Sequence, residues 1–240
     1  MMLSVQGISK SFRGLWAVSN ASFDVPQGGI VALIGPNGAG KTTCFNMIAG
    51  VFAPDTGKVL FKGTEFHGRR PDQICAAGIG RTFQLVKPFA GLSVLDNVMV
   101  GAFLREKTTQ GARTLAMQVL RKLHLDPKAD MPASSLTLPD RKRLEVARAL
   151  ATRPKLLLLD EVMAGLRPTE CDEMVGVFRD LNRSDGLTIL LIEHVMRAVM
   201  ALAQRVVVLH HGEVIARGAP AEVVRDPAVL ECYLGEETEV

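Results

Sequence analysis

A glycine-rich stretch near the N-terminus carries the clearest chemistry in this sequence. Residues 35–42 read Gly-Pro-Asn-Gly-Ala-Gly-Lys-Thr and fit the pattern G-x-x-x-x-G-K-[ST]. Glycines let a backbone wrap closely enough for its N–H groups to converge on phosphate oxygens, and the start of a following helix adds about half a positive charge. The pattern predicts that Lys41 reaches the β- and γ-phosphates of a nucleotide, that the Thr42 hydroxyl binds Mg²⁺, and that Thr43 makes a further phosphate contact. The loop before them consists of Gly35, Pro36, Asn37, Gly38, Ala39 and Gly40.

Two adjacent carboxylates form a second chemical group. Asp160 and Glu161 directly follow the apolar run Leu156–Leu159, which is typical of a buried strand. Such a strand would end at the carboxyl edge of a sheet, where ligands bind in open α/β folds, beside the phosphate loop. We expect Asp160 to serve the Mg²⁺ side and Glu161 to polarise the attacking water, a contribution of about 10²–10⁴-fold.

Two further residues carry little information alone. His194 follows the strand-like run Thr188–Ile192, and a lone histidine is more often a surface or core residue than a catalytic one. Gln84, in the segment Arg81-Thr82-Phe83-Gln84, is likewise uninformative by itself.

The elements that must position these residues alternate between strands and helices. Ile30–Ile34 is a continuous apolar run suited to a strand covered on both faces, and a helix is expected from the loop to about Ala49, closed by Gly50. The last third predicts strands and helices in alternation, which implies right-handed crossovers and a mostly parallel sheet. The other expected strands are Leu3–Ile8, Ala21–Val25, Lys58–Lys62, Arg205–His210 and Glu213–Arg217, and the other expected helices are Val94–Arg105, Gly111–Leu123, Pro139–Ala151, Glu170–Leu181 and Met196–Ala203.

Composition excludes several classes of protein. The chain has 240 residues, a net charge of +3, 48% hydrophobic and 22% charged residues, as in a packed globular protein. Its longest apolar runs fall short of the ~20 residues that cross a bilayer, and no secretory signal is expected at its start. The four cysteines form neither a CxxC pair nor a zinc pattern, which favours a reducing compartment. Positive charge is dense only at Arg141-Lys142-Arg143, so we expect no nucleic-acid partner.

Taken together, the phosphate loop, Gln84, Asp160-Glu161 and His194 resemble the nucleotide-binding subunit of an ABC transporter over nearly the whole chain. Within that family the chain is most similar to the ATPases of branched-chain amino acid uptake systems. The segments that carry this likeness are Gly80–Gln84 with Phe89, Ser93–Val98, Arg143–Ala149, Leu191–Met196 and the ending Tyr233-Leu234-Gly235-Glu236.

The resemblance implies a fold and further roles. It implies an α/β P-loop NTPase of the ABC ATPase type: one domain over 1–240 with a RecA-like core, an N-terminal antiparallel β subdomain and a helical subdomain inserted at about 87–151. By position, Phe12 would stack on adenine, Gln84 would touch the Mg²⁺ site and sense the membrane subunit, and His194 would contact the γ-phosphate. The implied cofactors are ATP and Mg²⁺.

The resemblance also implies an assembly. The chain would lie on the cytoplasmic face of the cell (inner) membrane and bind transmembrane permease subunits and a second ATPase subunit. That pair would form a heterodimer, with a homodimer as the alternative. A periplasmic or extracellular substrate-binding protein would act indirectly.

Two segments depart from the family pattern. Leu136-Thr137-Leu138-Pro139-Asp140 stands where Leu-Ser-Gly-Gly-Gln is usual, and Arg167 stands where Asp or Asn is usual. In the family both regions face the partner's nucleotide. Pro139 lacks an N–H there, and we expect the Asp140 carboxylate to repel the γ-phosphate. The resulting hypothesis is a heterodimer with two unequal sites, against the simpler alternative that the altered loop still closes normally.

A different class of function stays open at this point. A P-loop NTPase that acts as a nucleotide-dependent switch or binding module, outside transport, accounts for Gly35–Thr42. It gives no purpose to Glu161 beside Asp160 or to His194.

Overall fold

The computed structural model describes residues 1–84 and 87–234, and the acidic tail Gly235–Val240 lies outside them. The chain forms two compact units. Unit 1 comprises Met1–Ile74 and Thr188–Val240, and unit 2 comprises Cys75–Leu187. Unit 2 is therefore an insertion in the sequence of unit 1. In the described part of the chain, no helix combines the length and the apolar character that a bilayer crossing needs.

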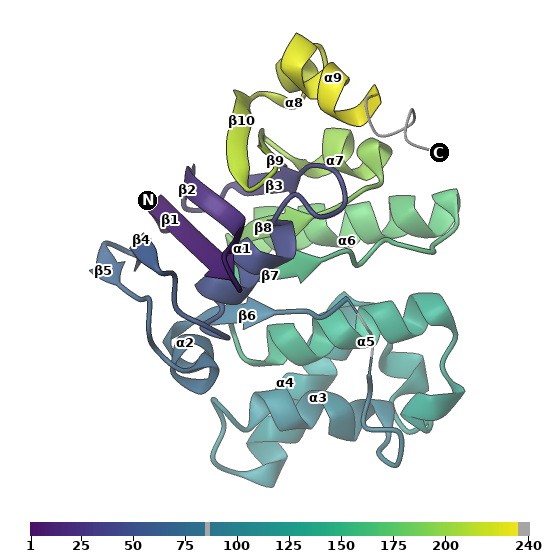
Figure 1. The fold of residues 1–240 in the computed structure, drawn as a ribbon. Coiled ribbons are helices and arrows are strands. Elements are labelled where there is room, and N and C mark those ends of the chain that lie inside the picture. The colour runs from purple at the N-terminus through teal and green to yellow at the C-terminus, as the bar shows by residue number, and fades with distance from the viewer. Residues whose placement is uncertain (85–86, 235–240) are drawn as a thin grey trace. The chain divides into compact units, whose positions relative to one another are not determined.

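Unit 1 holds an antiparallel sheet with the strand order β2-β1-β4-β5. Figure 1 shows these strands in purple and blue. Their bounds are β1 Leu3–Phe12, β2 Leu15–Val25, β4 Thr56–Phe61 and β5 Thr64–Glu65. Strands β1 and β2 are longer than the alternating runs predict, because their pairing continues to Phe12 opposite Leu15, past several register shifts. This sheet agrees with the expected antiparallel β subdomain.

Four more strands of unit 1 lie in the order β10-β9-β3-β8. Strand β3 pairs in parallel with both β8 and β9, while β10 joins β9 as an antiparallel edge. Their bounds are β3 Ile30–Ile34, β8 Thr188–Ile192, β9 Arg205–His210 and β10 Glu213–Gly218. Every residue of β3 and β8 is buried, which explains their uninterrupted apolar runs. The predicted bounds of β3, β8 and β9 are confirmed.

The helices of unit 1 are short and follow the strands. Helix α1 begins at Lys41, directly after the glycine-rich loop, and ends at Ile48, with Gly50 just beyond its cap residue Ala49. The later helices are α7 Met196–Leu202, α8 Pro220–Val223 and α9 Pro227–Leu234. Helix α2, Pro71–Ala77, contains the boundary between the units. Helices α2, α8 and α9 were not predicted; α8 has only four residues, which is too few to show a helical period.

Unit 2 combines two parallel strands with helices. Strands β6 (Ile79–Arg81) and β7 (Leu156–Asp160) pair in parallel. Helices α3, α4 and α5 contact one another and lie together in Figure 1. The helices are α3 Val94–Ala102, α4 Thr109–Lys122, α5 Leu138–Ala151 and α6 Pro168–Asp185, with short 3₁₀ turns at Asp126–Lys128 and Ala133–Ser135. Strand β6 was not predicted, because it has only three residues and one of them is glycine.

Candidate functional site

The glycine-rich loop connects β3 to α1 in unit 1 and has room only for glycine at two positions. A Cβ on Gly35 would lie 2.0 Å from the carbonyl oxygen of Leu209, and Gly35 has a φ of +144°. A Cβ on Gly40 would lie 2.3 Å from the carbonyl oxygen of Ala17, at a φ of +99°. Both positions combine a left-handed backbone with a neighbouring strand in close contact, so the loop is held tightly against β2 and β9.

Lys41 is folded back over this loop. Its Nζ donates hydrogen bonds of 2.6 Å to the carbonyl oxygens of Gly35 and Pro36, and its side chain is buried. The ammonium group therefore lies inside the curve of the loop, together with the N-terminus of α1. The positive end of the helix and the lysine charge make this loop a place for an anion such as a phosphate group.

His194 lies in the same unit and at the same edge of the sheet as the loop. It is the second residue after β8, and the loop begins directly after β3. Since β3 and β8 are parallel neighbours, with Leu33 opposite Ile192, both segments leave the sheet at its carboxyl end. The His194 side chain is exposed there. Unit 1 thus places the loop and His194 at the same edge of its sheet.

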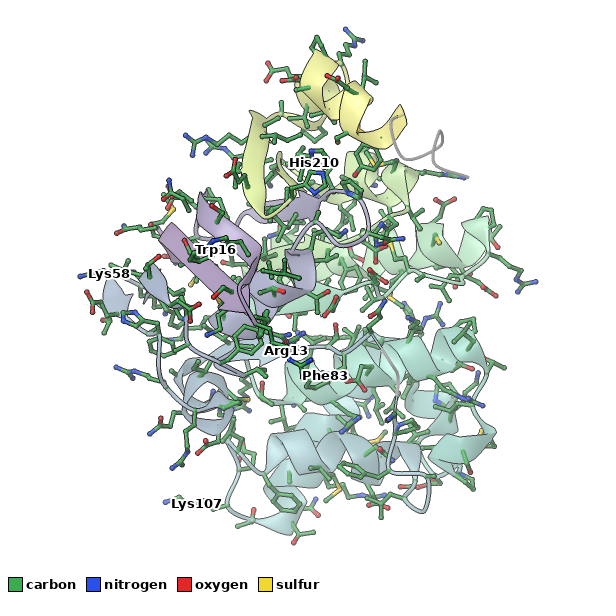
Figure 2. The ribbon with its side chains drawn as sticks, in the orientation of Figure 1. Arg13, Trp16, Lys58, Phe83, Lys107 and His210 are labelled. Atoms are coloured by element: carbon green, nitrogen blue, oxygen red, sulfur yellow. The ribbon has the colours of Figure 1, made fainter. Side chains whose placement is uncertain are left out.

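Phe12 ends β1 in unit 1 and keeps an exposed face. Its ring packs edge-on against Phe52, with 5.3 Å between centroids, and the Nζ of Lys10 lies 5.9 Å from its centroid. Phe52 follows the end of α1, so the aromatic pair is tied to the helix that the loop begins. Trp16 lies on the neighbouring strand β2 (Figure 2) and is also exposed. An exposed aromatic ring of this kind can stack on a planar base.

Unit 2 brings the other three predicted residues together. Asp160 ends β7, Glu161 follows it, and Gln84 lies three residues beyond the parallel strand β6. The Nε2 of Gln84 donates a hydrogen bond of 2.5 Å to Oε2 of Glu161. Glu161 has a φ of +50°, a left-handed conformation that is rare for a residue with a side chain. Among the described residues, six other non-glycine residues also have a positive φ.

Asp160 forms a buried ion pair that the sequence did not reveal. Its Oδ2 lies 2.9 Å from Nη2 of Arg81, and the two side chains are 2% and 10% exposed. The backbone N–H of Asp160 also donates to Oγ1 of Thr82. Arg81 and Thr82 belong to the segment already singled out for Gln84, so their position in that segment was the available signal.

The start of α5 corrects one prediction. The Asp140 carboxylate is buried, forms an ion pair with Lys128 and accepts a 2.7 Å hydrogen bond from the Thr137 hydroxyl. The predicted repulsion of a phosphate assumed an uncompensated carboxylate, and that assumption is wrong, because Lys128 neutralises the charge inside unit 2. Pro139 lies in the first turn of the helix, as predicted. Arg167, the other departure, is exposed and binds Glu170.

Two remaining features are quickly described. Burial raises the pKa of the Cys44 thiol to about 12, so this cysteine is an inert packing residue of α1. Within residues 1–84 and 87–234, no three His, Cys, Asp or Glu side chains cluster as metal ligands.

A phosphate-binding loop on a mostly parallel sheet, with paired acids after another strand, defines a P-loop nucleotide-binding protein. Residues 18–164 match the ABC transporter family profile, and residues 213–239 match a profile described as branched-chain amino acid ATP-binding cassette transporter.

Individual relatives extend over the whole chain. The chain is 37% identical to the high-affinity branched-chain amino acid transport ATP-binding protein LivG of Salmonella typhimurium, over 98% of both chains. It is 34% identical to the lipopolysaccharide export system ATP-binding protein LptB of Acidithiobacillus ferridurans, over 100% of this chain and 99% of the relative. A crystal structure of the ADP conformation of MJ1267, an ATP-binding cassette of an ABC transporter, is 30% identical, with a TM-score of 0.89 and 98% of both chains covered.

The chain belongs to the family of ABC transporter ATP-binding proteins, which are ATPases. Its fold is that of a P-loop ABC ATPase, and it binds ATP. Members of this family are subunits of membrane-associated transporters.

Proposed function

We propose that this chain is the ATP-hydrolysing subunit of a transporter that imports branched-chain or related amino acids. The match at residues 213–239 carries the choice of substrate, because that profile is described by branched-chain amino acid transport. Overall identity does not decide it, since LivG at 37% and LptB at 34% are nearly equally similar. The C-terminal match therefore favours amino acids over lipopolysaccharide.

In this proposal the nucleotide is held by unit 1. The backbone N–H groups of residues 35–43 bind the phosphates, and Lys41 leaves its carbonyl contacts to reach the β- and γ-phosphates. The exposed ring of Phe12 stacks on adenine. His194, at the same sheet edge, contacts the γ-phosphate.

Hydrolysis then requires a base for the attacking water. Glu161 accepts a proton from the water molecule while the water oxygen forms a bond to the γ-phosphorus. The bond between the γ-phosphorus and the β-γ bridging oxygen breaks, which releases ADP and phosphate. Gln84 is the residue that orients the Glu161 carboxylate, since its amide donates to Oε2.

Mg²⁺ fits the donor set of the chain. Thr42, Asp160 and Gln84 offer hydroxyl, carboxylate and amide oxygens, which are the ligands this hard cation takes. When bound, Mg²⁺ neutralises charge on the phosphate oxygens. The ion pair with Arg81, at 2.9 Å, keeps Asp160 as a buried carboxylate, which is the charge that this role requires.

The proposed assembly holds this chain as a peripheral subunit on the cytoplasmic face of the cell (inner) membrane. It contains transmembrane permease subunits and a second ATPase subunit, while a periplasmic or extracellular binding protein delivers the amino acid. We propose one ATPase domain over 1–240 with a helical subdomain at about 87–151, where α3, α4 and α5 contact one another.

We propose the heterodimer with two unequal sites on narrower grounds than the sequence offered. Asp140 no longer contributes repulsion, but Pro139 offers no N–H and the Thr137 hydroxyl is directed to Asp140. A partner nucleotide that docks on this segment would therefore lack two donors. Changing Glu161 to Gln should abolish most ATPase activity of the heterodimer, and the same change in the partner subunit should cost little.

Co-expression with the permease subunits tests the proposed function. The complex should purify from detergent-solubilised membranes and, in lipid vesicles supplied with ATP and the binding protein, take up radiolabelled leucine. Uptake should be lost with Glu161→Gln and retained with Lys122→Met, an exposed control. A complex that hydrolyses ATP but moves none of leucine, isoleucine and valine would contradict the substrate class.

A further inference from the structure

Three charged side chains of α5 face the segments that carry Gln84 and Glu161. Lys142, Glu145 and Arg148 recur every three residues and so lie along one side of the helix. Lys142 and Glu145 are only 5% and 4% exposed. Burying a charge is costly unless good partners compensate it, so the contacts of these two side chains point to their purpose.

Lys142 binds the backbone of the proposed base. Its Nζ donates a 3.0 Å hydrogen bond to the carbonyl oxygen of Glu161. The same carbonyl accepts a 3.3 Å bond from the N–H of Ala164, so it is held from two directions. These bonds restrain the peptide that follows Glu161, and so the backbone position from which its side chain begins.

Glu145, about one turn further along α5, faces the segment that carries Gln84. The backbone N–H of Phe83, the residue before Gln84, lies near the Glu145 carboxylate and favours its ionised form (Figure 2 labels Phe83). Burial raises the pKa of Glu145, although Arg148 and Lys142 both favour its ionised form. Arg148 donates 2.9 Å to Glu145 and 3.2 Å to the carbonyl oxygen of Lys87.

Lys142 and Glu145 face the two segments that the hydrogen bond between Gln84 and Glu161 joins. Gln84 donates to Glu161, while α5 binds the backbone carbonyl of Glu161 through Lys142 and places the Glu145 carboxylate near the backbone N–H of Phe83. All of these residues belong to unit 2.

We infer that Lys142 and Glu145 are positioning residues for ATP hydrolysis: Lys142 aims Glu161 through its carbonyl, and Glu145 aims Gln84 through the Phe83 amide. The inference rests on the proposed function, in which Glu161 is the base. Neither side chain contacts the nucleotide in this role. Their loss should lower kcat and leave ATP affinity unchanged, because the phosphate loop is built from residues 35–43.

The first experiment separates catalysis from binding. Lys142→Met, Lys142→Arg and the control Lys122→Met are compared for ATP Kd and kcat, in the purified chain and in its transporter complex. Lys122→Met removes the same charge from an exposed ion pair with Asp185. Lys142→Met should lower kcat at least about tenfold, since small misplacement of a reacting group is expensive. Its Kd should change less than twofold, Lys142→Arg should recover most of the rate, and Lys122→Met should match the parent.

A second experiment needs no hydrolysis. Amide hydrogen exchange of Phe83 should accelerate in Glu145→Leu and stay near the parent rate in Glu145→Gln, which keeps an acceptor oxygen. Exchange of the Ala164 amide should accelerate in Lys142→Met. Where Lys142→Met does not fold, Lys142→Gln, which is neutral and shorter, takes its place in both experiments.

The outcomes separate this inference from the proposed function. A parent rate in Lys142→Met, or a loss that Lys142→Arg does not recover, overturns the positioning role of Lys142. Unchanged Phe83 exchange in Glu145→Leu overturns that of Glu145. A parent chain without ATPase activity, or Glu161→Gln at full rate, overturns the proposed function, while the exchange data still decide whether α5 holds these two backbones.

Discussion

Replacing Arg81 by methionine should destabilise unit 2 strongly, because it removes a cation from beside a buried carboxylate. Arg81 and Asp160 are 10% and 2% exposed and lie 2.9 Å apart. Methionine keeps much of the length of the side chain and its apolar contacts, so the main change is the loss of charge.

The magnitude follows from this burial. Removing one partner of a buried ion pair costs about 3–5 kcal/mol, since the remaining charge stays in a poorly solvated place. For a chain of this size about 1 kcal/mol lowers Tm by roughly 2–4 °C, so Arg81→Met should melt roughly 6–20 °C below the parent. Adding Asp160→Asn removes the buried charge, and the double variant should regain at least about 2 kcal/mol over Arg81→Met.

Urea unfolding of the parent, both single variants and the double variant measures this coupling, with EDTA present so that no divalent cation replaces the arginine. Arg81→Lys serves as the control, since it keeps the charge and should lose far less than Arg81→Met. The reasoning is refuted if the two single effects add to within about 0.5 kcal/mol, because additivity means that the pair does not interact.

Three other perturbations have defined outcomes. Lys41→Ala should abolish the ATP-induced rise in Tm, which in the parent corresponds to about 2.7 kcal/mol at 100 Kd; an unchanged rise would remove the phosphate loop from the mechanism. Burial alone would raise the pKa of Asp140, but the ion pair with Lys128, the hydrogen bond from Thr137 and the charge of Arg143 together hold that pKa below its usual value. This stabilisation is complete above the unfolded pKa of about 4 and is lost as pH falls through the folded pKa, so urea midpoints should fall less steeply below pH 4 in Asp140→Asn than in the parent. Native Cys44 should not react with a thiol reagent at pH 8, where its thiol is protonated and buried, whereas half-buried Cys75 should; mass spectrometry of the labelled peptides distinguishes them.

The sequence predicted the long buried elements well. Ile30–Ile34 and Thr188–Ile192 lie in the structure with the predicted bounds, because strands covered on both faces must be apolar at every position. Short elements were missed for a related reason. Strand β6 has three residues and helix α8 has four, and such lengths show no period. Their bounds are set by pairing and packing with distant parts of the chain.

The site was predictable where the chemistry imposes a local pattern. The spacing of glycines and Lys41 is dictated by phosphate geometry, so the loop was found directly. Lys142 gave no such signal. Within Arg141-Lys142-Arg143 it has the composition of a solvated surface, and only the turn of α5 places its ammonium group on the Glu161 carbonyl. The charge of Asp140 was predicted to be uncompensated for the same reason: its partner Lys128 lies in a separate 3₁₀ turn, and only the fold brings the two side chains together.

The left-handed backbone of Glu161 has an evolutionary consequence. Glycine is the residue that adopts a φ of +50° without steric cost, so Glu161→Gly relieves strain while it deletes the base. A selection for thermal stability alone would therefore retain the inactive Glu161→Gly variant. Random mutagenesis under heat selection, followed by sequencing, should enrich glycine at position 161, whereas selection for growth on the imported nutrient should purge it. At position 161, selection for thermal stability and selection for ATP hydrolysis therefore favour different residues.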